Sequence, residues 1–155
     1  MGVDANDELD ARAWVRYWQT GGPDAHKISH QRWVRHERFE ETTYELLRSG
    51  DVPAAMHRLD RLVELAQHDE AVLCMVGIGP IEAIFYLGLD TEPVVHELVS
   101  RRESSGWELV LLAAAPAWWP DRMHLPGVKW DVGAAPVATA TRKARGRGYS
   151  NRPRG

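Results

Sequence analysis

The chain has 155 residues, of which 44% are hydrophobic and 26% charged, and a formal net charge of −3 at pH 7. This length suits one domain, and the composition excludes a fibrous or wholly disordered chain. The longest apolar run, residues 109–119, is shorter than the roughly 20 residues of a membrane-spanning helix, and the acidic N-terminus has no secretory signal. The single cysteine, Cys74, excludes an intrachain disulfide. We therefore expect a cytoplasmic protein without membrane association.

Charge is distributed unevenly along the chain. Residues 1–141 contain 13 Lys and Arg against 22 Asp and Glu, whereas residues 142–155 contain no acid. The basic residues of this tail are Arg142, Lys143, Arg145, Arg147, Arg152 and Arg154. Its Gly and Pro content predicts disorder. Two interpretations remain open: a segment that binds RNA or another polyanion, and a solvated extension without a partner. The acidic remainder argues against duplex binding by the folded part.

The first half of the chain predicts three helices. The first spans residues 7–20, with Leu9, Ala13 and Tyr17 on one face, and ends before Gly21 and Gly22. The second extends from Asp24 to Arg48, with Gly50 closing it. Asp51 is the expected N-cap of the third, the clearest amphipathic helix of the chain. Its buried stripe consists of Met56, Leu59, Leu62, Val63 and Ala66.

The second half predicts shorter helices. Asp69 caps an apolar segment over residues 71–76, and a tight turn over residues 77–79 leads to a buried helix that ends at Gly88. Another helix begins at Asp90 or Thr91, and Ser105 with Glu108 fits a capping box for a last helix through Ala115. Pro116 is expected to end that helix.

These elements predict an all-α, single-domain bundle of six or seven short helices over residues 7–119. An irregular arm rich in Pro and Gly would follow over residues 120–141, and the disordered basic tail over residues 142–155.

Four motifs carry a resemblance to a known family. They are Trp14-Val15-Arg16-Tyr17, Glu45-Leu46-Leu47, the apolar stripe from Leu59 to Leu65 with the acidic turn Asp69-Glu70, and Gly77-Ile78-Gly79-Pro80-Ile81-Glu82. Over about residues 10–115 the chain resembles small bacterial helical proteins known only as a domain of unknown function, with the patterns W-[IV]-x-Y and G-x-G-P-[LI]-E. The resemblance implies an all-helical fold and a bacterial, cytoplasmic origin. It implies no activity.

Few residues indicate chemistry. Residues 77–79 do not form a dinucleotide-binding motif, because Glu82 replaces its third glycine and a helix precedes it, so we expect no cofactor. Glu82 either satisfies N–H groups at a helix start or is a buried carboxylate with a partner. His26 and His30, four residues apart, are weak candidates for metal ligands in a metal-dependent hydrolase. Surface or helix-capping histidines are the simpler interpretation.

Tryptophan is unusually frequent, with seven residues in the chain. We expect Trp14, Trp18 and Trp33 in the core, and Trp118, Trp119 and Trp130 as anchors of an interface. Cys74, in an apolar segment, is expected to be buried and unreactive. No nucleophile or phosphate-binding motif is present. The leading hypothesis is a non-catalytic protein-interaction or immunity-type accessory module, and the alternative is an RNA- or polyanion-associated protein that uses the tail.

Overall fold

The fold is all-helical in the computed structural model, which describes residues 4–22 and 30–118, and no strand occurs in these ranges. The elements are α1 (Ala5–Gln19), α2 (His30–Arg48), α3 (Val52–Ala66), α4 (Glu70–Val76), the π-helix η2 (Gly77–Ile81), α5 (Glu82–Tyr86), α6 (Glu92–Ser100) and α7 (Trp107–Trp118). Because α4, η2 and α5 follow one another without a break, they form one continuous rod, named here the α4–α5 rod. The all-α expectation of six or seven helices is confirmed. The expected arm and tail lie outside the described residues.

Local signals set most helix boundaries. The carboxylates of Asp51 and Asp69 accept hydrogen bonds from the backbone N–H groups of Ala54 and Val72, at 3.2 and 3.1 Å, so both predicted N-caps are confirmed. Gly50 ends α2 in the left-handed conformation, with φ of +83°, which favours glycine. The start of α2 is observed at His30, and the expected part before it, residues 24–29, lies outside the described residues.

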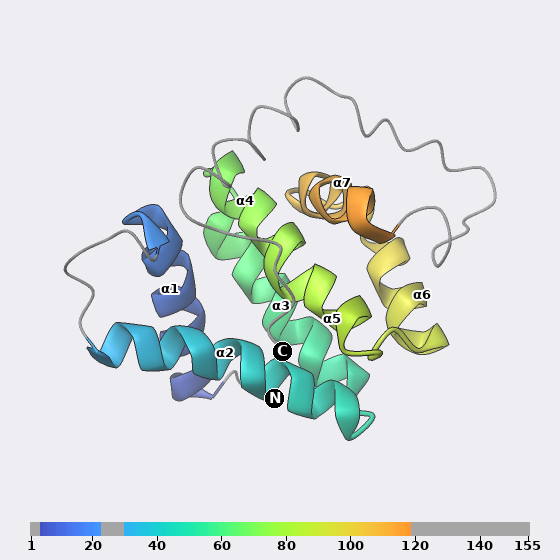
Figure 1. The fold of residues 1–155 in the computed structure, drawn as a ribbon, viewed down its shortest axis with the longest axis horizontal. Helices are drawn as coiled ribbons and strands as arrows, with labels where there is room; N and C mark the ends of the chain where they lie inside the picture. The colour runs from blue at the N-terminus through green and yellow to red at the C-terminus, as the bar shows by residue number, and fades with distance from the viewer. Residues whose placement is uncertain (1–3, 23–29, 119–155) are drawn as a thin grey trace.

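The core lies where these helices meet. Helix α1 packs against α2 and α3, while α3 also packs against α4, and α7 covers α4 and η2 (Figure 1). The predicted stripe of α3 is confirmed, since Met56, Leu59, Leu62, Val63 and Ala66 are all buried. Trp14 and Trp18 of α1 and Cys74 of α4 are buried as expected.

Two side chains expected in the core lie on the surface. Leu9 is 48% exposed, and Asp10, next to it, is buried instead at 2%. Ala13 and Tyr17 of the predicted stripe are buried, so the difference is confined to the first turns of α1, where Asp10 faces inward and binds arginines of α2. Trp33 is 44% exposed near the start of α2, so its predicted core position is wrong. Further along α2, Phe39, Tyr44 and Leu47 contribute to the hydrophobic core.

The predicted turn at residues 77–79 is also wrong, because Gly77 has helical dihedral angles (φ −64°, ψ −55°) and the rod continues through it. The expected close approach of backbone does occur. A Cβ atom on Gly77 would lie 2.3 Å from the carbonyl oxygen of Val110 and 2.9 Å from Cβ of Ala113. Glycine at this position therefore serves the contact with α7 rather than a chain reversal.

Helix α7 differs from its prediction at both ends. It begins at Trp107, which makes Gly106 (φ +82°) the residue before it, and the hydroxyl of Ser105 instead accepts a hydrogen bond from Nε2 of Gln67 at 2.8 Å. The helix continues past Pro116 to Trp118. A proline this close to a helix end removes only one hydrogen bond from the ladder, and the helix tolerates that loss.

Candidate functional site

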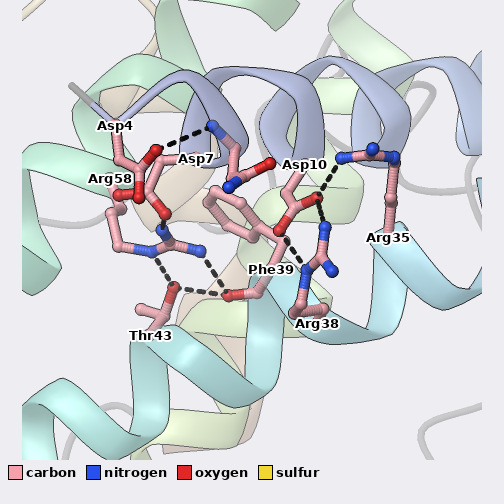
Figure 2. A network of polar contacts seen from close by, with 9 residues as sticks. Asp4, Asp7, Asp10, Arg35, Arg38, Phe39, Thr43 and Arg58 are labelled. Carbon is pink, nitrogen blue, oxygen red and sulfur yellow. Dashed lines mark hydrogen bonds and ion pairs between the residues drawn. The ribbon is translucent and has the colours of Figure 1, made fainter.

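The most concentrated polar chemistry joins α1 to α2 and α3. Three acids in the first half of α1, Asp7, Glu8 and Asp10, each pair with arginines of other helices. Figure 2 shows two of these acids facing the guanidinium groups of Arg35, Arg38 and Arg58 across the helix interfaces. We call Asp7, Glu8, Asp10, Arg35, Arg38, Arg58 and Arg61 the α1 network.

Arg58 of α3 is the deepest charge of the α1 network, at 4% exposed. One of its Nη groups pairs with the carboxylate of Asp7. Its Nε donates to Oγ1 of Thr43 and its other Nη to the carbonyl oxygen of Phe39, both at 3.2 Å. The guanidinium also lies 4.8 Å from the centre of the Phe39 ring. Hydrogen bonds on every nitrogen and an aromatic face offset the cost of burying this charge.

Asp10 receives two arginines from α2. Nε and Nη2 of Arg38 donate to its two oxygens at 2.7 and 2.6 Å, and Nη1 of Arg35 donates at 3.1 Å. The hydrogen bonds from Asp10 raise the pKa of Arg38 above its usual value. The two-pronged contact fits the planar guanidinium and fixes the register of α1 on α2.

Glu8 makes the equivalent contact with α3. Nε and Nη2 of Arg61 each donate to one of its oxygens at 2.7 Å, and Nε of Arg12 adds a bond within α1 at 2.7 Å. The hydrogen bond from Arg61, assisted by Arg12, lowers the pKa of Glu8 to about 2, although partial burial opposes this shift. The carboxylate of Glu8 therefore stays ionised well into the acid range.

Aromatic rings close the other half of the α1–α2 interface. His36 of α2 is 3% exposed and stacks on Tyr17, with ring centres 4.1 Å apart. Trp14 and Trp18 lie at 5.9 and 5.7 Å from the same imidazole. The indole N–H of Trp14 donates to Oε1 of Glu40 at 3.2 Å. His36, which forms a histidine cluster with His26 and His30 in the sequence, is thus part of the core.

A second ion-pair centre joins α3, α6 and α7. Arg101 donates from Nε and Nη2 to the two oxygens of Asp60, at 2.7 and 2.9 Å, and from Nη1 to Oε2 of Glu97 at 2.6 Å. The indole N–H of Trp107 donates to Oδ1 of Asp60 at 2.9 Å. The hydrogen bonds from Asp60 raise the pKa of Arg101. This centre holds the turn between α6 and α7 against α3.

In both centres, ion pairs between arginine and carboxylate side chains hold neighbouring helices together. Asp7, Glu8, Asp10 and Asp60 each accept hydrogen bonds from the guanidinium group of an arginine that lies outside their own helix. Each of these carboxylates is held in a fixed orientation toward its arginine.

The surface charge of the described side chains is strongly negative. The exposed acids are Asp4, Glu41, Glu45, Asp51, Glu64, Glu70, Glu92, Glu103 and Glu108, and the exposed basic residues are Arg12, Arg16, Arg38 and Arg48. Of these four arginines, Arg12, Arg38 and Arg48 pair with acids. Glu45 and Glu64 are also paired, with Arg48 and Arg61, and the exposed acids still outnumber the exposed arginines among the described side chains.

Most sequence-predicted site residues lie beyond the described part of the chain. His26, Trp119, Trp130 and the basic residues of the tail fall outside it, and His30 and Trp118 are described only as the ends of α2 and α7. Within residues 4–22 and 30–118, no group of three His, Cys, Asp or Glu is arranged to hold a metal ion.

Glu82 is described in full. It is 2% exposed and follows η2 inside the continuous rod, so no free helix N-terminus is present for it to satisfy. The helix-start explanation is wrong, and the carboxylate lies in the core.

Sequence reasoning missed Asp10 and Arg58. Arg58 had a signal, because it lies three residues after Ala55 and four before Leu62, on the buried face of α3. A charge in the middle of an apolar stripe indicates a buried ion pair. Asp7 and Asp10, one helical turn apart, were the available partners.

The fold and its two ion-pair centres define an all-helical protein clamped by arginine–carboxylate contacts. Among the described residues, no helix combines the length and the apolar character needed to cross a bilayer. Comparisons with models of known families, with curated proteins and with solved structures give no match. The family resemblance read from the motifs therefore gains no support from these comparisons.

Proposed function

We propose that this protein is a non-catalytic interaction module of the bacterial cytoplasm whose acidic surface binds a basic protein, in the manner of an immunity-type accessory protein. The observation that carries the proposal is the excess of exposed carboxylates over exposed arginines, most of which are already paired. A surface of one sign attracts a partner of the other sign and accelerates its association. The buried Cys74 suits a reducing compartment.

The ion-pair centres support this proposal from inside the molecule. The α1 network and the Arg101 centre tie five helices together through two-pronged contacts. A scaffold held in this way presents its surface without rearrangement, and a preformed surface loses less entropy on binding.

A pull-down with charge variants tests the proposal. The tagged full chain is compared with a variant carrying Glu70→Gln, Glu92→Gln, Glu103→Gln and Glu108→Gln, all at exposed positions. The matched control carries Glu→Asp at the same four positions and keeps the charge. After nuclease treatment, a basic protein identified by mass spectrometry should remain with the wild-type and Asp forms and be lost from the Gln form. Equal capture by the Gln form would contradict the proposal.

RNA binding by the basic tail is the second candidate. It is favoured by six basic residues and no acid in residues 142–155. Contacts to phosphates release counterions, so affinity for single-stranded RNA should fall steeply with salt. The full chain with the six basic residues changed to Gln should lose both the affinity and its salt dependence. Unchanged RNA binding by this variant would end the hypothesis.

A further inference from the structure

An exposed apolar pair ends the α4–α5 rod. Tyr86 and Leu87 are each 47% exposed, next to Gly88, where the chain leaves helical geometry with φ of +68°. The acids Asp90 and Glu92 follow within six residues. Residues 62–100 contain no Lys or Arg; of their acids, Glu64 and Glu97 pair with the flanking Arg61 and Arg101, Glu82 is buried, and Asp69, Glu70, Asp90 and Glu92 remain. We call Tyr86, Leu87, Asp90 and Glu92 the α5 patch.

The course of α7 brings the rest of the chain toward this patch. A Cβ on Gly106, before α7, would meet Val63 and Leu73, and one on Gly77 would meet Val110 and Ala113. The residues that meet therefore increase in residue number along both elements, so α7 and the rod run in the same direction. Helix α7 also contacts α5. The C-terminal end of α7, Trp118, therefore points toward the α5 end of the rod.

The tail has the chemistry that complements the α5 patch. Residues 142–155 combine six cations with Tyr149, an aromatic ring that can cover apolar surface. Residues 119–141 connect α7 to this tail, a length that in a random-coil chain corresponds to a root-mean-square span of roughly 25 Å. Such a tether gives the tail an effective concentration on the order of millimolar at nearby surfaces, so a weak contact is sufficient.

We propose that the α5 patch is a docking surface for the chain's own basic segment, residues 142–155. Tyr149 covers Tyr86 and Leu87, while neighbouring arginines lie against Asp90 and Glu92. The docked tail neutralises the acidic surface and competes with a basic partner for it. This contact does not depend on the proposed function, because it is formed within one molecule.

Paramagnetic broadening in the full chain tests the proposal. A nitroxide is attached to Ser150→Cys, while Cys74, at 0% exposure, is shielded from the reagent. At low salt, amide signals of residues 86–92 should lose intensity selectively relative to the reduced label, and the loss should diminish at high salt. The variant Tyr86→Ser/Leu87→Ser should abolish the selective loss. The matched control Leu9→Ser, at an exposed apolar residue of α1, should retain it.

Three results would overturn the proposal. If residues 86–92 show no broadening, the tail does not bind the α5 patch, and its cations serve another ligand, such as RNA. Broadening that survives Tyr86→Ser/Leu87→Ser means that the patch is not the contact. Finally, broadening in a mixture of isotope-labelled chain without nitroxide and unlabelled chain with nitroxide would assign the contact to a second copy.

Discussion

The carboxylate of Asp7, in the first turn of α1, pairs with the buried guanidinium of Arg58 on α3, 51 residues further along the chain. The two side chains differ in their access to water, since that of Asp7 is 34% exposed and that of Arg58 only 3%. Loss of either partner therefore has unequal consequences: an unpaired Asp7 gains hydration, whereas an unpaired Arg58 remains desolvated.

The first prediction follows from this asymmetry. Asp7→Ala should lower the free energy of unfolding by roughly 2–4 kcal/mol, because a buried charge loses its counter-charge. Adding Arg58→Met should restore part of that loss, because the charge is then removed as well. Urea unfolding of the single and double variants measures both effects. A double variant less stable than Asp7→Ala alone would contradict this account of the pair.

The second prediction concerns Gly77. In a helix free of contacts, Gly→Ala stabilises by about 1 kcal/mol. Here Gly77→Ala should instead destabilise by about 1–3 kcal/mol, because the new methyl group would overlap the carbonyl oxygen of Val110. Thermal unfolding measures the difference. Combining it with Ala113→Gly should rescue little, since the closer obstacle is backbone; full rescue would show that the Ala113 methyl was the obstacle.

Glu8 supplies a pH prediction. Its pKa is lowered from 4.5 to about 2 in the folded protein, so the folded state favours the ionised form. The stabilisation is therefore complete above pH 4.5 and is lost as the pH falls toward about 2. The free energy of unfolding should decline less over this window in Glu8→Gln than in the wild type. Glu41→Gln, at an exposed residue of α2, is the control, and equal declines in all three proteins would refute the prediction.

Substitution of Arg101 tests whether its charge or its planar shape holds the turn between α6 and α7. Lysine keeps the positive charge but lacks the planar fork that meets both oxygens of Asp60. Arg101→Lys should therefore loosen the turn between α6 and α7 and speed amide hydrogen exchange at residues 101–107, at a cost of about 1 kcal/mol. The neighbouring Arg102→Lys serves as the control. Exchange rates that match those of the control would show that charge alone holds the turn.

The sequence predicted the helices whose signals are local. Asp51, Asp69 and Gly50 act within one turn of their own position, and the stripe of α3 repeats at the helical period, so each was identified correctly. The turn expected at residues 77–79 was wrong, because the reason for glycine at position 77 is a contact with a distant part of the chain. Gly77 packs against α7, which begins thirty residues later in the chain, and no nearby residue reports that contact.

The α1 network shows the same difference between local sequence signals, which were predicted correctly, and contacts between distant helices, which were not. The apolar stripe of α1 was right for Ala13 and Tyr17 but wrong for Leu9, because hydrophobic periodicity takes no account of Asp10, a carboxylate that two arginines of α2 hold in the interface. Trp33 was placed in the core by its residue type alone, yet the packing of α2 leaves it half exposed. The residues proposed for the tail and for the interface anchors at Trp119 and Trp130 remain predictions.

The α4–α5 rod also constrains the order in which the protein completes its fold. Every residue from Ala71 to Glu82 is buried, and part of its cover is α7. During synthesis, at about 5–20 residues per second, the rod is therefore made, and emerges from the ribosome, before the helix that shields it. Between the emergence of the rod and that of α7, the Gly77 face lacks the cover that Val110 and Ala113 give it in the folded protein, and an apolar surface is then open to a chaperone.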